Sequence, residues 1–318
     1  MDPIHVIIAN YNGSKYVENC LRALEQGDIL NVIFVDDCST DDSLGIVRKD
    51  FPSVEVIENR KRRGAAESKN IGARRALRKG AEFIAFLDVD TKPEKGWSTE
   101  LLDAIHESGS IGGVGSQLMT YDGREVHPTM MTVEGMGYAE TFAQHAKASP
   151  DSLFFSRRLI GAAMLFTADS LLHVGLHDPG YFTYFEDSDL CRRMLYHGYS
   201  LAIVPRSRVR HESSSYTHPL RFKRLFYRNS MRYLLKDPCL PLANKAAMRL
   251  RYLYRRPASS SIIGIASKPV TIERDVILRE SLRVFLTIPE IEIKTHLEMR
   301  GGCYIDQSLR ARLKEFRL

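Results

Sequence analysis

The first hundred residues alternate short strand-forming segments with helix-forming stretches. Four segments are rich in Val, Ile and Phe and are each followed by polar turn residues: 4–9, 32–35, 54–57 and 83–87. Between them, Ser39 is expected to cap one helix, and Gly80 is expected to end another over 65–79. This alternation predicts an α/β fold, in which helices flank a mainly parallel sheet and ligands bind beyond the carboxyl ends of its strands.

The second half of the chain follows a less regular pattern. Strands are expected over 111–118 and 200–204, and helices over 168–174 and 188–197. From Pro219 onward the chain is expected to be mostly helical. Apolar side chains lie among Arg and Lys between Pro219 and Lys236, which predicts a basic amphipathic helix.

Composition narrows the class of protein. With 44% hydrophobic and 26% charged residues, the 318-residue chain is typical of a globular protein. Its five scattered cysteines form no CxxC pair, which favours a reduced cytoplasmic protein over a disulfide framework or a zinc ribbon. The apolar run 4–9 is too short for a signal peptide, and no run approaches the ~20 residues that span a bilayer. The net charge of +6 is compatible with nucleic acid, an anionic membrane surface or neither.

Two carboxylates, Asp88 and Asp90, directly follow the apolar segment 83–87. A strand that ends in this way places hard oxygen ligands at the ligand-binding edge of the sheet, where Mg²⁺ or Mn²⁺ can bind a diphosphate. Such a metal neutralises charge on a leaving nucleoside diphosphate. An acidic turn without any metal is the alternative for this pair taken alone.

A second acidic cluster contains Glu186, Asp187 and Asp189 and follows the aromatic segment 181–185. A carboxylate beside aromatic surface can act as a general base toward a sugar hydroxyl. Acidic residues at a helix start can also serve only as caps. His211 lies beyond the strand expected over 200–204 and a turn at Pro205, and there it is either a metal ligand or a structural histidine. A histidine beside carboxylates favours Mn²⁺ slightly over Mg²⁺.

Polar residues also end the first two predicted strands. Tyr11 follows the first strand, and Asp36 and Asp37 follow the second. A tyrosine ring and a carboxylate at adjacent strand ends can stack a nucleobase and accept its N–H. No G-x-G-x-x-G motif follows the first strand and no P-loop motif occurs, which disfavours dinucleotide-dependent dehydrogenases and P-loop NTPases.

Together these motifs resemble the family 2 glycosyltransferases, and in particular their rhamnosyltransferase-like branch. The matching motifs occur in the family order: Ile7-Ile8-Ala9-Asn10-Tyr11-Asn12, Val35-Asp36-Asp37-Cys38-Ser39-Thr40-Asp41, Gly64 to Gly72, Leu87-Asp88-Val89-Asp90-Thr91, Gly161 to Phe166, Tyr184-Phe185-Glu186-Asp187-Ser188-Asp189-Leu190, and His211-Glu212-Ser213. The similarity covers roughly residues 4–236.

The resemblance implies a GT-A-type fold and inverting transfer of a sugar from a nucleotide diphosphate donor to an acceptor hydroxyl, in the synthesis of a bacterial surface polysaccharide or glycoconjugate. UDP- or dTDP-linked donors are favoured, with Mn²⁺ or Mg²⁺ as cofactor. The acceptor is expected to be a saccharide or a lipid-linked molecule.

The resemblance also implies roles for individual residues. Tyr11 and Asp37 look like base contacts, with Asp36 sharing that role. Asp90 looks like the direct metal ligand, and Asp88 like a ribose or water-mediated contact.

In the later motifs, Asp187 looks like the catalytic base, with Glu186 as the weaker candidate. His211 looks like a further metal or diphosphate ligand. Asn70 would hold the donor loop or pack its helix. Many relatives carry Thr or Pro at the position of Ala9, so a hydroxyl contact to the nucleobase would be missing here. The basic segment 60–63 would either steer the diphosphate or form an exposed turn.

The corresponding domains are a GT-A-type catalytic domain over 1–215, with a nucleotide-binding half 1–95 and an acceptor half 96–215, and a mostly helical region over 216–318. In relatives, segments like the basic helix lie against the cytoplasmic membrane, so we expect a cytoplasmic protein with peripheral membrane contact through its basic C-terminal helices. The apolar residues of that helix would pack on the catalytic domain.

Two other functions compete with this hypothesis. A sugar nucleotidyltransferase also combines a parallel sheet, a metal and acidic strand ends, but it usually shows a Gly-rich basic loop after its first strand. A catalytically silent nucleotide-sugar-binding protein is the second alternative. Nucleic-acid binding rests on the basic helix alone and is not expected. The sequence does not identify the donor, the acceptor, the linkage or the oligomeric state.

Overall fold

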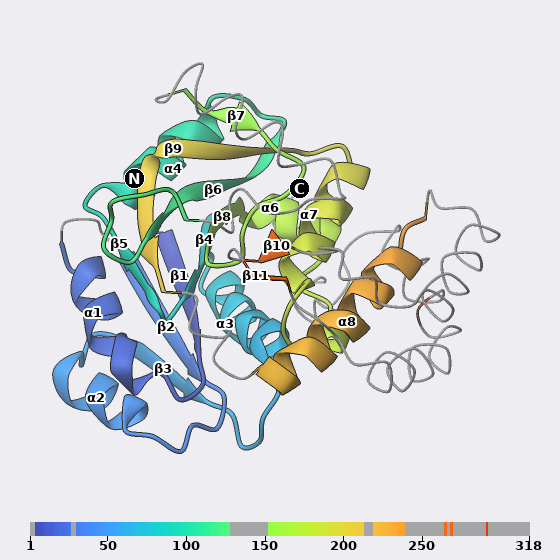
Figure 1. The fold of residues 1–318 in the computed structure, drawn as a ribbon. Helices are drawn as coiled ribbons and strands as arrows, with labels where there is room; N and C mark the ends of the chain where they lie inside the picture. The colour runs from blue at the N-terminus through green and yellow to red at the C-terminus, as the bar shows by residue number, and fades with distance from the viewer. Residues whose placement is uncertain are drawn as a thin grey trace.

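The computed structural model describes residues 4–26, 30–127, 152–212 and 219–238, together with 264–265, 268–269 and 291. Within these residues the chain folds around one nine-stranded sheet with helices on both faces (Figure 1). The strands are β1 (Ile4–Asn10), β2 (Leu30–Asp36), β3 (Glu55–Glu58), β4 (Phe83–Asp88), β5 (Thr91–Pro93), β6 (Ile111–Thr120), β7 (Phe154–Phe155), β8 (Ala163–Thr167) and β9 (Ser200–His211). The helices are α1 (Ser14–Leu24), α2 (Ser43–Asp50), α3 (Ala65–Arg78), α4 (Trp97–His106), α6 (Ala168–Val174), the 3₁₀ turn η2 (Pro179–Tyr181), α7 (Glu186–Tyr196) and α8 (Pro219–Leu235).

The strand order is β3-β2-β1-β4-β8-β6-β9-β5, with β7 paired to β9. The first four strands in this order are parallel, as the strand–helix alternation predicts. Beyond them, β8 is antiparallel to both β4 and β6, and β5 and β7 are antiparallel to β9. β6 and β9 are parallel to each other. The α/β fold with flanking helices is therefore confirmed, and the sheet is mixed beyond its first four strands.

The two faces of the sheet carry separate cores. Successive residues of a strand point to opposite faces, so Ile8 belongs to the core on the side of α1, α2 and α4, whereas Ile7 belongs to the core on the side of α3, α6 and α7. Apolar residues at helical spacing supply the other side of each core, for example Leu21 of α1 and Leu190 of α7.

One predicted helix start is wrong. The helix expected after Ser39 begins later, because α2 starts at Ser43 with Asp42 at the N-cap position. The Ser39 hydroxyl instead donates to Asp36 Oδ1 at 2.5 Å, and its backbone N–H donates to Asp36 Oδ2 at 2.9 Å. Ser39 therefore closes the loop after β2 rather than capping a helix.

The predicted turn at Pro205 is also wrong, because β9 continues through Pro205 to His211. The β6–β9 pairing shifts register between Ser116 and Gln117, opposite this part of β9. A register shift accommodates a proline inside a strand, since proline has no N–H for the ladder. As a result, His211 lies on a strand and pairs with Thr91 of β5.

α7 begins at Glu186 instead of residue 188, so both predicted catalytic carboxylates lie in its first turn. The predicted basic amphipathic helix is confirmed as α8. Residues 264–265 and 268–269 form the short antiparallel strands β10 (Gly264–Ile265) and β11 (Lys268–Pro269), while most of the predicted helical region after Pro238 lies outside the described residues. Among the helices that are described, none has the length and apolar character needed to cross a membrane.

Candidate active site

Three parallel strands end side by side at one edge of the sheet. In register, Asn10 of β1 faces Asp36 of β2, and Ala9 of β1 faces Asp88 of β4. Asp36 is buried and accepts a hydrogen bond from Asn10 Nδ2 at 2.9 Å, so it organises the loop after β2. Ala9 is half-buried and offers a methyl group with no hydrogen-bonding atom. The carboxyl ends of parallel strands share an edge, which is why the strand-end residues meet here.

The Asp37 carboxylate is surrounded by donors from one loop. Its Oδ1 accepts Nδ2 of Asn59 at 3.0 Å and the backbone N–H of Arg63 at 2.7 Å. Its Oδ2 accepts Nε of Arg62 and the backbone N–H of Gly64, both at 2.9 Å. Asp37 therefore fastens the basic loop to the sheet, and a nucleobase N–H would have to share or replace one of these donors.

Arg62 also covers the ring of Tyr11. The Arg62 guanidinium carbon lies 3.1 Å from the ring centroid, in a cation–π contact. Tyr11 is otherwise one of the exposed large side chains, at 40% exposure. The ring face that could stack a base is thus occupied by a side chain from the basic segment, a contact that neither sequence-based interpretation of 60–63 predicted.

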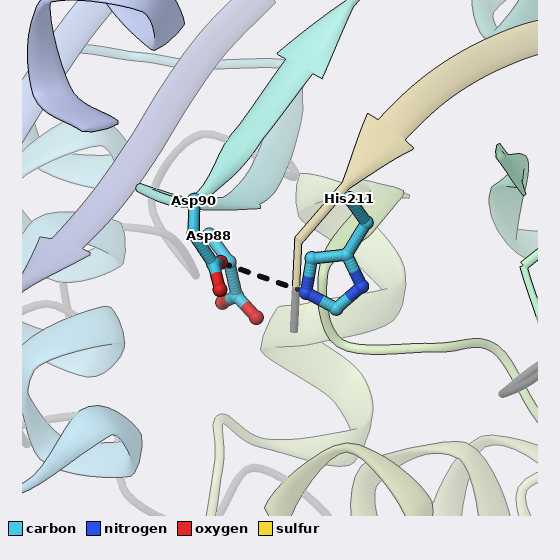
Figure 2. A group of neighbouring side chains, drawn as sticks. All are labelled: Asp88, Asp90 and His211. Carbon is cyan, nitrogen blue, oxygen red and sulfur yellow. Dashed lines mark ion pairs between the residues drawn. The ribbon is translucent and has the colours of Figure 1, made fainter. Parts of the chain in front are cut away.

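Asp88, Asp90 and His211 form a cluster in which one ligand atom from each lies within 4.8 Å of the others (Figure 2). The pairing of β5 with β9 creates it, because Thr91 faces His211 and thereby brings Asp90 beside the histidine. Asp90 Oδ1 lies 3.5 Å from His211 Nε2. Two carboxylates and an imidazole are a donor set that suits Mn²⁺ or Mg²⁺, so these residues fit the implied metal.

The cluster also changes the pKa values of two histidines. Burial lowers the pKa of His211, but the hydrogen bond and the negative charge of Asp90 outweigh burial and raise it overall. His127, at the end of the segment after β6, places its ring 5.2 Å from the His211 ring. Burial and the neighbouring His211 lower the pKa of His127 to about 4, so His127 is neutral near pH 7. No motif in the sequence around His127 points to this residue.

Lys69 is a buried cation between the two acidic clusters. Its Nζ lies 3.0 Å from Asp88 Oδ1 and 3.8 Å from Glu186 Oε1, and it donates to the carbonyl of Gly161 at 3.1 Å. Burial lowers the pKa of Lys69, yet the carboxylates of Asp88 and Glu186 more than compensate and raise it. Sequence reasoning missed this residue, although its place beside Asn70 in the Gly64 to Gly72 motif was a signal.

Asp187 is held in place by hydrogen bonds. Its Oδ2 accepts the N–H of Gly161 at 3.0 Å, and its Oδ1 accepts the N–H of Ser188 at 2.6 Å. Burial raises the pKa of Asp187, but the charge of Arg158 and the Gly161 N–H outweigh burial and lower it overall. Asp187 is therefore an oriented, ionised carboxylate.

Glu186 lies in a different environment although it is the adjacent residue. Its Oε2 is buried and has no hydrogen-bond partner among the described residues. Burial raises the pKa of Glu186 to about 7, with Lys69 opposing and Asp187 adding to the shift. Neighbouring carboxylates with separated pKa values are typical of acid–base sites.

Asn70 contacts the segment that precedes η2. Its Nδ2 donates to the carbonyl of His177 at 2.8 Å, and its Oδ1 accepts the His177 N–H at 3.0 Å. Both ends of this buried amide thus bind the segment before η2, which corresponds to the packing alternative. Its role toward the donor loop stays a prediction.

Residues 5–154 match the family model described as glycosyl transferase family 2. An uncharacterized glycosyltransferase of Haemophilus influenzae is 30% identical over 168 residues, which is 51% of this chain and 51% of that protein. A putative teichuronic acid biosynthesis glycosyltransferase, TuaG of Bacillus subtilis, is 28% identical over 42% of this chain and 55% of that protein. The dTDP-rhamnosyl transferase RfbF of Shigella flexneri is 25% identical over 65% of this chain and 68% of that protein. The chain thus spans about half the length of the first two relatives.

Solved structures match the fold over more of the chain. S. aureus TarS 1-349 in complex with UDP-GlcNAc has a TM-score of 0.55 at 16% identity, covering 99% of this chain and 92% of that one. The mannosyltransferase PcManGT from Pyrobaculum calidifontis, in complex with GDP-Man and Mn²⁺, has a TM-score of 0.53 at 16% identity, covering 99% and 79%. These structures confirm the GT-A-type fold predicted from the motifs, and the family match over residues 5–154 supports the family resemblance.

Proposed function

Since residues 5–154 match the family 2 glycosyltransferases and the chain has a GT-A-type fold, we propose that it transfers a sugar, with inversion, from a nucleotide diphosphate sugar to an acceptor hydroxyl. One observation carries this proposal. Asp88, which belongs to the metal-ligand cluster, and Glu186, at the start of α7, are joined by the same buried cation, Lys69. The metal site that would bind the donor diphosphate and the carboxylates that would activate the acceptor hydroxyl can thus act on the same anomeric carbon.

In this proposal the donor nucleoside binds at the ends of β1 and β2. Tyr11 stacks the base after Arg62 leaves its ring, Asp37 accepts a base N–H, and Asp36 and Ala9 shape the loop between them. UDP- and dTDP-linked sugars are the favoured donors. Structural neighbours bound to UDP, UDP-GlcNAc and GDP-Man support a nucleotide sugar of this class.

Asp90 and His211 would hold Mn²⁺ or Mg²⁺, with Asp88 contacting it through water or binding the ribose. When bound, the metal supplies Lewis-acid neutralisation of the leaving diphosphate. The neighbours solved with Mn²⁺ support this cofactor. Lys69 holds the Asp88 carboxylate in place beside the cluster, since the two side chains form an ion pair at 3.0 Å.

We propose Asp187 as the general base, from its place in the family motif and its fixed orientation. Glu186 is the second candidate, because its pKa is about 7 and its Oε2 has no hydrogen-bond partner among the residues that the structure describes, so it is well matched to accept a proton at neutral pH. In Asp187→Asn, donor binding should persist and transfer should fall by about a hundredfold or more. If Asp187→Asn keeps full transfer and Glu186→Gln loses it, the base is Glu186.

The bacterial polysaccharide-related names of two relatives support a saccharide or lipid-linked acceptor. We propose a cytoplasmic location with peripheral membrane contact. Exposed cations such as Arg224 on α8 would face the lipid, since Arg232 and Lys236 are buried. We also propose a catalytic domain over 1–215, with a nucleotide-binding half 1–95 and an acceptor half 96–215. The C-terminal region covers 216–318, and its helix α8 would pack on the catalytic domain.

The deciding experiment is a thermal-shift panel of UDP-, GDP- and dTDP-sugars with and without Mn²⁺, followed by a transfer assay for each stabilising donor. Metal-dependent stabilisation with turnover supports the proposal. Stabilisation without turnover on any acceptor would favour the catalytically silent binding protein. Release of pyrophosphate from a nucleoside triphosphate and a sugar phosphate would favour the nucleotidyltransferase.

A further inference from the structure

The turn that leads into α7 has an unusual backbone. Phe182, Tyr184 and Phe185 have φ values of 65°, 68° and 71°, in the left-handed region that non-glycine residues seldom adopt. Such a conformation persists only where surrounding structure over-determines it. The turn Phe182–Phe185 therefore needs support from outside its own sequence.

Asn229 of α8 supplies that support. Its side chain is fully buried, and its Nδ2 donates to the carbonyl of Tyr181 at 2.7 Å, of Thr183 at 2.6 Å and of Tyr184 at 3.0 Å. An amide nitrogen has two hydrogens, so one of them is shared between two of these carbonyls. A single side chain thus binds three backbone carbonyls in and beside the turn.

α8 is itself fixed to both sides of the turn. Ahead of η2, Asp178 pairs with Arg232 at 2.9 Å and with Lys236 at 3.0 Å. On α7, Asp189 pairs with Lys236 at 2.8 Å. Both carboxylates are fully buried, so water does not compete for these ion pairs. Figure 1 shows α8, in orange, lying beside α7.

The turn connects this anchored helix to the candidate active site. Glu186 and Asp187 follow Phe185 directly and begin α7. On the other side, the carbonyl of Phe182 accepts the N–H of Ala66, in the first turn of α3 beside the loop that holds Asp37. A displacement of the turn would therefore move the candidate base relative to the donor site, and misplacements of about 1 Å can slow catalysis about a hundredfold.

We propose that Asn229 is a positioning residue for the Glu186–Asp187 pair: its three hydrogen bonds hold the left-handed turn Phe182–Phe185, and thereby α8 sets the position of the general base. This inference rests on the proposed transfer function. If it holds, α8 is needed for catalysis as well as for folding.

The test compares Asn229→Ala and the milder Asn229→Ser with Tyr196→Phe in the full chain. Tyr196→Phe removes a different contact of α7, the 2.8 Å hydrogen bond from Tyr196 at its carboxyl end to Asp237 just after α8. Backbone hydrogen exchange is followed over residues 181–189, and kcat and the donor KM are measured with Mn²⁺ and the donor that the thermal-shift panel selects. Exchange reports the turn whether or not the protein is active.

We expect Asn229→Ala to speed exchange over 181–189 and to lower kcat about tenfold to a hundredfold, with a smaller change in KM. Asn229→Ser, which keeps one donor, should lie between the wild type and Asn229→Ala and covers the case in which Asn229→Ala does not fold. Tyr196→Phe should change neither quantity. An unchanged kcat in folded Asn229→Ala or Asn229→Ser, or a loss of kcat with unchanged exchange, overturns the proposal. If the wild-type protein transfers no sugar but the Asn229 variants still exchange faster, the proposed transfer function is overturned. The conclusion that Asn229 holds the turn then stands.

Discussion

Asp90 and His211 face each other where β5 meets β9, with Asp90 Oδ1 3.5 Å from His211 Nε2. The register of β5 against β9 brings these two residues together although they are far apart in the chain. The protonation of His211 depends on this contact. The raised pKa of His211 has the Asp90 hydrogen bond as its main favourable cause, against burial. A metal that bound here would displace any proton from the imidazole, because it needs the same nitrogen.

Removing either side chain should therefore abolish metal-dependent donor binding. We expect Asp90→Ala and His211→Ala to lose the Mn²⁺-dependent rise in Tm with UDP, with affinity lower by about tenfold or more. Thermal shift with and without Mn²⁺ measures this directly. Asp122→Ala, in the exposed turn after β6, is the matched control and should behave as the wild type. Retention of the Mn²⁺ effect in both site variants would rule out this cluster as the metal site.

The buried Lys69 should be important for stability as well as for the site. In Lys69→Met the carboxylates of Asp88 and Glu186 lose their shared cation. Breaking a fully buried ion pair costs about 3–5 kcal/mol in the free energy of unfolding, and water reaches the Asp88 side chain, which is 36% exposed, so we expect a cost of about 2–3 kcal/mol. Urea denaturation at pH 8 measures this cost. The added substitution Glu186→Gln should recover part of the loss, because one of the unpaired charges is then gone. Lys79→Met, at an exposed ion pair with Glu55, should cost below about 1 kcal/mol; an equal cost for both lysines would contradict the assigned role.

Glu186 should make stability fall as the pH rises. Its pKa is about 7 in the folded protein against an ordinary value of 4.5, so its contribution is fully present below pH 4.5 and is lost as the pH rises through 7. Glu186→Gln cannot ionise and should therefore have a higher Tm than the wild type at pH 8, with little difference at pH 5. Thermal unfolding without added metal, from pH 5 to 8, gives the comparison. The exposed Glu25→Gln should show no such trend, and a parallel pH profile for wild type and Glu186→Gln would contradict the burial argument.

Arg62 should compete with the nucleobase for the ring of Tyr11. Because its guanidinium carbon lies 3.1 Å from the ring centroid, Arg62→Ala should expose that face and tighten UDP binding by roughly threefold, if displacing a cation–π contact costs about 0.5–1 kcal/mol. Titration calorimetry of UDP with Mn²⁺ measures the change. Lys61→Ala removes one positive charge from the same loop without uncovering the Tyr11 ring. It is therefore the control for the effect of lost charge on UDP binding. Weaker binding in Arg62→Ala alone would show that Arg62 contacts the nucleotide.

Much of the fold was predictable because its signals are local. The apolar segments at β1 and β4 and the glycine after α3 specify elements through periodicity and backbone preference, which neighbouring residues alone determine. Predicted element boundaries were wrong where a contact outside the local sequence determined the structure. Ser39 bonds Asp36 instead of capping α2, and Pro205 lies inside β9 because the facing strand shifts its register.

The candidate site divides in the same way. The family motifs, by order and spacing, identified the carboxylates at the strand ends and those that begin α7. They did not reveal that Lys69 joins Asp88 to Glu186, or that Arg62 lies on Tyr11, because those contacts cross between elements distant in sequence.

The sequence by itself determined which residue types stand at the ends of which strands, and hence the class of chemistry available. Only the tertiary structure decided which carboxylates share a cation, which nitrogen faces Asp90, and which helix holds the turn before α7. The physical reason is that charge, burial and hydrogen bonding depend on distance in space, and the pairing of β5 with β9 and the packing of α8 set those distances.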